Sequence, residues 1–476
     1  MGLNSEDKEG VKYTPSFDIM GKREKEREEM DQENRIQLSD HFTYGRLIRF
    51  TIPTIASMIF LSCYSIVDGL FISNFAGKIA FASVNLVFPL FSIIGVFGIM
   101  IGTGGSAIIG AALGMGDHDR AKGYFSFFTV MCVVVGILGG IVGLFALEPL
   151  VVFLGAEPDM MEYCMRYGTI GMLTVPFFML QFMFQSLFVT AEKPGLSFIV
   201  TVATGLLNIG LDAIFIIWLG WGVTGAAIAT AIAEVFGGTA PLIYFLRPND
   251  SLLRIVNPLV DFGALGKACV NGLSEFVSMI SESIVITLYN YQLLRIAGAD
   301  GVAAYGAIQY ISFIFFAVFA GYNMGVQPVF SYNYGADTRT ELKNLFSKSV
   351  LLMESEGLLM AVLLFSFAKP LASIFVGYDG YLLEMTAHGT RIYAILFITC
   401  GFNIFATGMF TALNNGIVSA ICSFVRVIIC ECGAVLILPV FWGLNGIWAS
   451  APIAEIGATA IVVVFTIALR KKYGYA

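Results

Sequence analysis

The sequence predicts an all-α membrane protein with twelve transmembrane helices arranged as two pseudo-symmetric six-helix lobes. Three observations lead to this prediction: the composition, the spacing of apolar runs and an internal repeat. Of the 476 residues, 57% are hydrophobic and only 13% are charged. The mean hydropathy is +0.81. A typical soluble domain carries roughly 25% charged residues, so this chain has too little charge to face water on all sides.

Long apolar runs recur along the whole chain. Each is long enough to cross a hydrocarbon core of ~30 Å at ~1.5 Å per residue. The runs do not alternate between polar and apolar residues, as the strands of a membrane barrel would. We expect helices over residues 46–73, 80–113, 122–146, 167–190, 195–219, 222–246, 266–294, 302–332, 343–367, 386–413, 417–440 and 443–469.

An internal repeat divides the chain into halves. At an offset of 221, Thr190–Glu234 aligns with Thr411–Glu455 with eleven identities in 45 positions, including a shared Trp-Gly-x-x-Gly turn. Each half holds an even number of helices, so the halves should be related by an axis along the membrane normal, with a cleft between them. The expected organisation is a cytoplasmic tail (1–45), an N-lobe (46–247), a linker (248–265), a C-lobe (266–470) and a short cytoplasmic tail (471–476).

Basic residues in the loops predict the orientation. With a cytoplasmic N-terminus, the loops and tail on the inner side after residue 46 hold twelve Lys and Arg, and the outer side holds five. This positive-inside bias places both termini in the cytoplasm. The inner residues are Arg120, Lys122, Lys193, Arg247, Arg254, Lys267, Arg339, Lys343, Lys348, Arg470, Lys471 and Lys472; the outer ones are Lys78, Arg166, Arg295, Lys369 and Arg391.

Several classes of function find no support in the sequence. The eight cysteines are scattered without CxxC spacing, so they predict neither a disulfide framework nor a zinc site. The motifs of a membrane zinc protease and of a nucleotide-binding P-loop are absent. We therefore expect no tightly bound cofactor and no nucleic-acid partner, and we expect energy to come from an ion gradient.

A few polar residues of the first half fall within apolar helices. A charged side chain at the bilayer centre costs ~2.5–3.5 kcal/mol or more, so it calls for a functional explanation. Asn208 and Asp212 are four residues apart and share one helix face. Counting from the outer helix ends at ~1.5 Å per residue, Asp68 and Thr230 lie at a similar height in the outer half of the bilayer.

These four residues predict a site for a small cation or a proton. Carboxylate, amide and hydroxyl oxygens suit a hard cation such as Na+. Two neighbouring carboxyl groups in a low-dielectric site cannot both ionise easily, so they would also share a proton and titrate together. The alternative is an internal hydrogen-bond network that only joins helices.

The second half has its own polar cluster. Glu282 and Arg426 fall near mid-membrane, and Glu275 lies nearer the inside. The alternative to a binding role is structural pairing, with Arg426 neutralising Glu282 or Glu431. Two acidic residues at equivalent positions of the repeat are expected to lie at the inner mouth in a structural role: Glu234 and Glu455.

Taken in order along the chain, these motifs resemble the multidrug and toxic compound extrusion (MATE) family over nearly the whole of residues 46–470. They are Pro53 with Val67-Asp68-Gly69 on the first helix, the segment LLNIGLDAIFI on the fifth, and WGVTGAAIAT ending at Thr230 on the sixth. FWGLNGIWASAPIAE repeats the last motif in the second half. A MepA-like bacterial branch of the family is the expected group.

The resemblance implies a transporter of two lobes that exports cationic, lipophilic compounds in exchange for Na+ or H+. It implies a coupling-ion site in the N-lobe at Asp68, Asn208, Asp212 and Thr230, and a helix kink at Pro53. Some members use an acidic residue on the seventh helix, for which Glu282 fits first and Glu275 second. The acidic residue that some members carry on the tenth helix has no counterpart in 392–413.

We therefore predict a monomeric antiporter of the plasma membrane that works by alternating access and is not an enzyme. One competing hypothesis is a flippase for lipid-linked oligosaccharides, which would need a cleft lined by Arg or Lys, whereas only Arg426 is deep. A membrane-embedded enzyme would need a recognisable nucleophile, metal or acid–base group at an interface. A passive channel suits buried carboxyl groups on separate helices less well than an occluding site does.

Overall fold

The computed structural model describes residues 36–476. Residues 1–35, which make up most of the predicted N-terminal tail and include its charged run 21–35, lie outside the described residues. Every regular element in the described part is helical.

The first group of helices begins with α2, whose N-terminus is capped by the Thr43 hydroxyl. Two other helices of this group, α5 and α6, have a proline in their first turn. A proline suits that position because its missing N–H has no partner there in any case. The group comprises α2 (Tyr44–Phe71), the π-helical η1 (Ile72–Ala76), α3 (Lys78–Gly114), α4 (His118–Phe153), α5 (Pro158–Thr190), α6 (Pro194–Asp212), the π-helical η2 (Ala213–Trp218) and α7 (Gly222–Leu246).

The second group follows a linker. It comprises α8 (Phe262–Asn271), α9 (Leu273–Gly335), α10 (Arg339–Ser366), α11 (Ala368–Val376), α12 (Gly380–Tyr393), η3 (Ala394–Leu396), α13 (Phe397–Ala412), α14 (Gly416–Phe424), the π-helical η4 (Val425–Glu431), α15 (Cys432–Trp442) and α16 (Leu444–Tyr473).

Eleven helical segments of the described chain are long and apolar enough to cross a membrane. One of them, α9, has 63 residues and contains Gly298 at φ 65° and ψ −153°, a conformation that interrupts the helix. A helix of that length would measure about 95 Å, far more than one span requires. Since α9 therefore holds two spans, the arrangement agrees with the twelve predicted helices.

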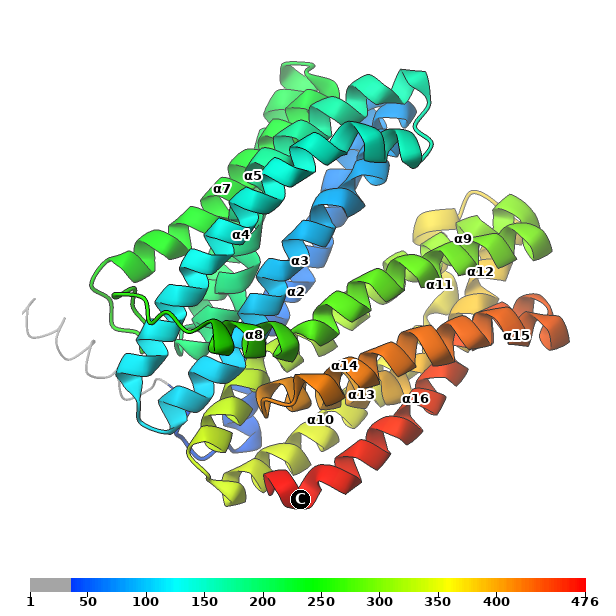
Figure 1. Cartoon of the computed structure of the whole chain (residues 1–476). Helices are drawn as coiled ribbons and strands as arrows, with labels where there is room; N and C mark the ends of the chain where they lie inside the picture. Colours follow the sequence, from blue (N-terminus) through cyan, green and yellow to red (C-terminus); the bar gives the residue numbers. More distant parts are fainter. Residues whose placement is uncertain (1–35) are drawn as a thin grey trace, which may run out of the picture.

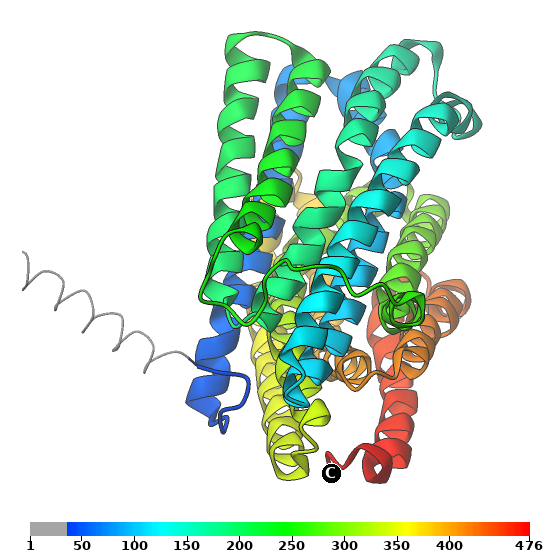
Figure 2. The same cartoon turned by 60° about the vertical axis from the view of Figure 1, so that its left-hand side comes forward.

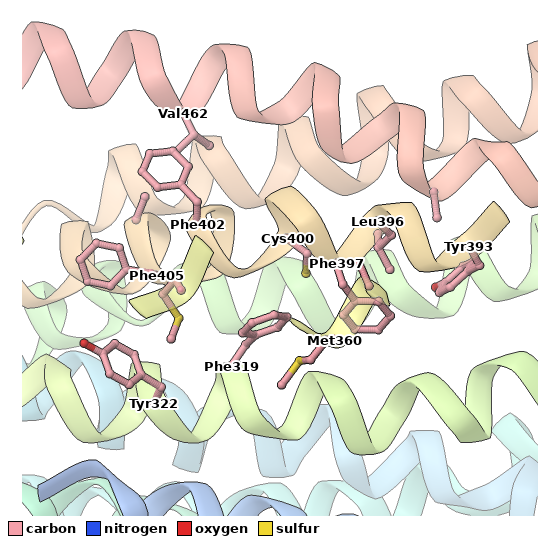
Figure 3. Close-up of a cluster of buried hydrophobic side chains, with 14 of the residues drawn as sticks. Phe319, Tyr322, Met360, Tyr393, Leu396, Phe397, Cys400, Phe402, Phe405 and Val462 are labelled. Carbon is pink, nitrogen blue, oxygen red and sulfur yellow. The ribbon is translucent and has the colours of Figure 1, made fainter. Parts of the chain in front are cut away.

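The helices gather into two bundles that diverge from one end of the molecule. Figure 1 shows α2–α7 on one side and α9–α16 on the other, with the bundles close together at the end that carries α8 and the C-terminus. Each bundle has a hydrophobic core of its own. Figure 3 shows part of the second core, where aromatic rings such as Phe319, Phe397 and Phe405 pack between α9 and α13.

Glycines let the bundles approach each other closely at the joined end. A methyl group at Gly104 or Gly114 of α3 would clash with the backbone carbonyl oxygen of Ala268 or Tyr332, respectively. On α9, a methyl group at Gly325 would lie 2.6 Å from the Thr54 hydroxyl of α2. Small residues of this kind allow membrane helices to pack backbone against backbone, so this end of the structure is tightly closed.

Polar contacts reinforce the closed end. Asn271 donates a hydrogen bond from Nδ2 to Oδ1 of Asn414 at 2.7 Å. Asn414 in turn donates to the Ala107 carbonyl of α3 at 3.4 Å. These bonds connect the beginning and the middle of the second group of helices with α3 of the first.

Two segments outside the membrane spans also lie at the closed end. The linker between α7 and α8 runs across α4 (Figure 2), where the Leu259 N–H donates to the Gly123 carbonyl at 3.1 Å. Before α2, the Leu38 N–H donates to Glu192 of the first bundle at 2.6 Å, and the Phe42 N–H donates to Glu341 of the second at 2.9 Å. The short segment 36–43 therefore contacts both bundles.

Candidate functional site

The polar residues predicted in the first bundle do come together. Asn208 and Asp212 lie one turn apart on α6, and both are buried. Asn208 donates from Nδ2 to the Thr230 hydroxyl of α7 at 3.5 Å. The hydroxyl of Tyr167 on α5 lies close to the same Thr230 side chain. Three helices thus place polar groups around Asp212.

Asp68 of α2 faces Asp212, and we call these two residues the carboxyl pair. The groups are close enough for one to donate a hydrogen bond to the other when it carries a proton. As two carboxylates they have no donor between them. Asp68 Oδ1, both carboxyl oxygens of Asp212 and Asn208 Oδ1 are then buried without a hydrogen-bond partner among residues 36–476. Buried oxygens of this kind are costly to leave unpaired.

These oxygens form a set that could hold a cation or a proton. Within residues 36–476, no group of three His, Cys, Asp or Glu side chains could bind a metal ion. The available donors are instead carboxylate, amide and hydroxyl oxygens from Asp68, Asp212, Asn208 and Thr230, a set that suits Na+ rather than a softer metal. A single proton shared by the carboxyl pair would also satisfy part of the set.

The helices beside the carboxyl pair depart from regular α geometry. The π-helical η2 begins directly after Asp212. The π-helical η1 begins four residues after Asp68, and the Ile72 N–H donates back to the Asp68 carbonyl. Short π-helical turns are rare and often accompany functional sites, and here two of them adjoin the two members of the pair.

Glu234 belongs to the same cluster, which corrects the expectation that it faces the inner mouth. It lies at the middle of α7, is buried, and accepts a hydrogen bond from the Thr174 hydroxyl of α5 at 2.6 Å. Tyr64 and Tyr167 each lie within electrostatic range of both Glu234 and Asp68. Glu234 follows Thr230 by four residues, so helical spacing alone places both on one face of α7.

In the second bundle, Arg426 pairs with Glu455. Its Nε lies 2.5 Å from Glu455 Oε1, and the Glu455 side chain is 5% exposed. Asn403 donates to the other carboxylate oxygen of Glu455 at 2.6 Å. The expected partners of Arg426 were Glu282 or Glu431, and that expectation is wrong. Glu455, which was expected at the inner mouth, is instead the residue that the guanidinium meets. Rotation of each helix about its axis and packing against its neighbours decide which carboxylate lies beside Arg426.

A cavity of about 330 Å³ lies between the bundles. Glu275 and Arg426 line it from the second bundle, and Gln185 lines it from the first. Glu282 is not among the lining residues. It is exposed on α9, within electrostatic range of Arg426. The structure therefore brings Glu275 and Arg426 together at the cavity and leaves Glu282 outside it.

Pro53 lies within α2, which continues as one helix on both sides of it. The Ser57 hydroxyl donates a hydrogen bond to the Pro53 carbonyl at 2.8 Å. One turn of α2 around Pro53 packs against Gly321 and Gly325 of the second bundle. The proposed kink stays a prediction.

Comparison with known families agrees with this architecture. The MatE family model matches residues 53–214 and, a second time, residues 276–433. Together the two matches cover more than half of the chain. The chain belongs to the MatE family. Its two matches fall one in each bundle, as expected from the repeat found in the sequence.

Curated relatives of this MatE protein carry the name of an export protein. The chain is 25% identical over 405 residues to the multidrug export protein MepA of Staphylococcus saprophyticus, covering 84% of this chain and 87% of the relative. It is 22% identical over 449 residues to MepA of Staphylococcus haemolyticus, covering 93% and 97%. The expectation of a MepA-like member of the family is thereby confirmed.

Solved structures share the fold of this MatE protein. One is described as the outward-facing conformation of a multidrug resistance MATE family transporter; it superimposes with a TM-score of 0.84 at 22% identity, covering 89% of this chain and 96% of that one. A second is a transporter from Pyrococcus furiosus whose description reports a reversed polarity of the binding pocket; its TM-score is 0.83 at 22% identity, covering 90% and 97%.

Family membership decides several expectations. The MatE chain is a multi-pass membrane protein and a transporter, and the expectation that it is not an enzyme is confirmed by membership of a transporter family. Its substrates are small molecules that it carries across a lipid bilayer.

Proposed function

We propose that this protein is a multidrug efflux transporter that exports cationic lipophilic compounds by antiport with H+ or Na+. The observation that carries the proposal is the carboxyl pair, Asp68 and Asp212, which is buried in the first bundle without a compensating basic side chain. No ion pair in residues 36–476 involves either residue. Such a pair gains stability when it takes up positive charge.

Uptake of positive charge would change the packing around the pair. The pair joins α2 to α6, and Asn208 and Thr230 extend the contact to α7. A bound proton or Na+ would draw these helices together, whereas the empty site leaves two negative charges facing each other. A ligand shifts a conformational equilibrium by its difference in affinity for the two states. Ion and drug would therefore compete by favouring different arrangements of the bundles.

The coupling ion enters as cargo and no tightly bound cofactor is needed. Asp68, Asp212, Asn208 and Thr230 would supply the oxygens for Na+, and the pair alone would suffice for a proton. The closeness of the two carboxyl groups, which would let them share one proton, supports H+. The experiment below, in which pH and Na+ gradients are imposed separately, distinguishes coupling to Na+ from coupling to H+.

The central cavity suits a cation with apolar surface. Among the cavity-lining residues the only acidic one is Glu275, and the positive charge of Arg426 is already paired with Glu455. Apolar side chains of both bundles, such as Met58, Phe182 and Met324, surround these charges. Met and aromatic residues adapt to ligands of varied shape and attract cations. The names of the relatives, multidrug export proteins, point the same way.

We further propose that the protein acts as a monomer in the plasma membrane with both termini in the cytoplasm. One chain contains both bundles, the cavity and the carboxyl pair. The positive-inside bias of the loops supports an orientation with the joined end of the bundles on the cytoplasmic side. The structure would then correspond to a state that is open toward the outside.

Dye export from proteoliposomes, with pH and Na+ gradients imposed separately, tests the proposal. We expect one of the two gradients to drive export of ethidium by the wild type. Asp212→Asn should lose gradient-driven export, because an amide cannot take up a proton and provides one charge less for Na+.

Glu162→Gln is a matched control, since Glu162 is an exposed acidic residue of α5 that pairs only with Arg166. It should export dye like the wild type. Export by the wild type that neither gradient drives would refute antiport, and unchanged export by Asp212→Asn would refute the assignment of the site.

A further inference from the structure

Glu234 is a buried carboxyl group of the first bundle that the carboxyl pair alone does not explain. It accepts a hydrogen bond from Thr174, and no ion pair of the described residues involves it. A neutral hydroxyl compensates a buried carboxylate far less than a basic side chain would. A purely structural role would be served by an amide, so the acidic group itself needs an explanation.

Polar contacts between α5 and α7 form a column that passes through Glu234. Tyr167 contacts Thr230, and one turn deeper on α7 Thr174 contacts Glu234. Both helices run in the same direction from the open end of the molecule. Four residues along α7 correspond to ~6 Å, so successive contacts follow each other at the spacing of a hydrogen-bonded water.

The column continues toward the central cavity. Gln181, seven residues beyond Thr174 on α5, packs against Gly237 of α7. Its Oε1 is buried without a hydrogen-bond partner in the described part of the chain. One turn further along α5, Gln185 lines the cavity between the bundles. An acceptor without a donor is thus located between Glu234 and the cavity, where a water molecule could bridge them.

At its upper end the column reaches Thr230, which accepts a hydrogen bond from Asn208, one turn before Asp212 on α6. Asp212 is fully buried, and both of its carboxyl oxygens lack partners within residues 36–476. Tyr64 of α2 and Tyr167 of α5 each lie within electrostatic range of both Glu234 and Asp68, and Tyr167 also lies within range of Asp212. None of them is basic, so no fixed positive charge holds Glu234 in its ionised form.

We propose that Glu234 is a third coupling carboxyl group, a relay that passes protons between the carboxyl pair and the central cavity. A proton that leaves the pair converts the Glu234 carboxylate to the acid and leaves the pair more negative by one charge. The Glu234 acid then releases that proton to water at Gln181 and Gln185 and returns to the carboxylate. This inference rests on the proposed antiport and specifies H+ as the coupling ion.

Proton release on substrate binding, combined with transport, tests the relay. The full chain in unbuffered detergent is mixed with saturating tetraphenylphosphonium, and the released protons are counted. Export of ethidium from proteoliposomes under a pH gradient is measured over a series of pH values. The variants are Glu234→Gln, which keeps the acceptor for Thr174, Glu234→Asp, which keeps the carboxyl group, and the exposed control Glu162→Gln.

We expect Glu234→Gln to bind tetraphenylphosphonium like the wild type and to release fewer protons. It should export ethidium at least about 100-fold more slowly, since one positioned proton-transfer group contributes a factor of this size. Glu234→Asp should recover much of the rate with a displaced pH profile. Glu162→Gln should match the wild type in every readout. A thermal melt of each variant separates loss of folding from loss of function.

Wild-type proton release and an unchanged pH profile in Glu234→Gln would overturn the relay while leaving antiport intact. Export by the wild type driven by Na+ alone would also overturn it. If Glu234→Gln does not fold, Thr174→Val provides the second test, since loss of its hydrogen bond must displace the pH profile if Glu234 carries the proton. An unaltered profile there would contradict the proposal. Absence of any gradient-driven export in the wild type would instead refute the proposed function.

Discussion

The two bundles hold the equivalent buried acids of the repeat, Glu234 and Glu455, in different ways. In the second bundle, Glu455 is fixed by the guanidinium of Arg426 at 2.5 Å and by the amide of Asn403. In the first, neither the carboxyl pair nor Glu234 meets a basic side chain in the part of the chain that the structure describes. The charge of Glu455 is neutralised within the protein, whereas the carboxyl pair and Glu234 are left to be neutralised by an incoming ion.

The repeat relates this difference to equivalent positions of the two halves. At the offset of 221, Glu234 corresponds to Glu455, so the acid is present in both halves. Arg426 occupies the place of Gly205, and Asp212 occupies the place of Gly433. The equivalent acids of the two halves therefore differ in the charged residues that the neighbouring positions of the repeat supply.

The largest expected effect is on stability, and it differs between the equivalent acids. Glu455→Gln leaves the buried guanidinium of Arg426 without its counter-ion, which costs about 3–5 kcal/mol in comparable cases. Glu234→Gln removes a charge that had no counter-ion and should cost much less. Thermal unfolding of both variants in the same detergent measures the difference. If both variants lose the same amount of thermal stability, the two acids do not differ in how strongly a counter-ion holds them.

The second prediction removes the ion pair of the second bundle as a whole. Arg426→Met combined with Glu455→Met replaces two charges by apolar side chains, a change that is often neutral or stabilising when both partners go. We expect the double variant to recover most of the stability that Glu455→Gln loses, as judged by its melting temperature. A double variant no more stable than Glu455→Gln would contradict a simple pairing role.

A smaller effect is expected from the hydroxyl beside the carboxyl pair. Thr230→Val removes the acceptor for Asn208 and the partner of Tyr167. The net contribution of one hydrogen bond is about 0.5–1.5 kcal/mol, so the apparent affinity for the coupling ion should fall by up to about 10-fold. The size of the ion gradient that gives half-maximal export, compared between the variant and the wild type, measures this affinity.

Thr239→Val is the matched control for that experiment. Thr239 lies on the same helix and donates only to the Val235 carbonyl one turn before it. It should leave the ion dependence unchanged. A loss of equal size in both variants would indicate a general effect on α7 and none specific to the site.

The smallest effect concerns the closed end of the bundles. Asn414 has a positive φ of 57°, so Asn414→Gly keeps the backbone conformation and removes only the side-chain bonds to Asn271 and Ala107. Without these bonds the contact between the bundles should be less stable by about 1 kcal/mol. The bundles should therefore separate at this end more often. Alkylation of Cys269, which lies on α8 beside it, should become a few times faster when followed by mass spectrometry. An unaltered alkylation rate would mean that the glycine contacts alone hold the bundles together at this end.

Much of the fold could be predicted from the sequence, because apolar length determines a membrane helix almost by itself. The twelve expected segments lie in the observed helices, and the place where α9 divides was expected from the gap between 266–294 and 302–332. The contacts of segment 36–43 were not predicted. Its buried Leu38 and Phe42 are two apolar residues within a polar stretch, and their partners lie about 150 and 300 residues further along the chain.

The candidate site was predicted unevenly for a geometric reason. Asp68, Asn208, Asp212 and Thr230 were expected together, since their depths agree and α6 places two of them on one face. Glu234 was missed although its spacing from Thr230 indicates the same face. Depth along a helix follows from counting residues, whereas rotation about the axis depends on packing against neighbours. The same limit led to wrong partners for Arg426.

Potentiometric counting of coupling ions tests the central comparison most directly. Proton uptake on lowering the pH, and Na+ binding at fixed pH, are compared for the wild type, the double variant Asp68→Asn with Asp212→Asn, and the double variant Arg426→Met with Glu455→Met. We predict that the first double variant loses the ion that the wild type binds and that the second retains it. Retention of that ion without the carboxyl pair, or its loss with the pair of the second bundle, would contradict the account.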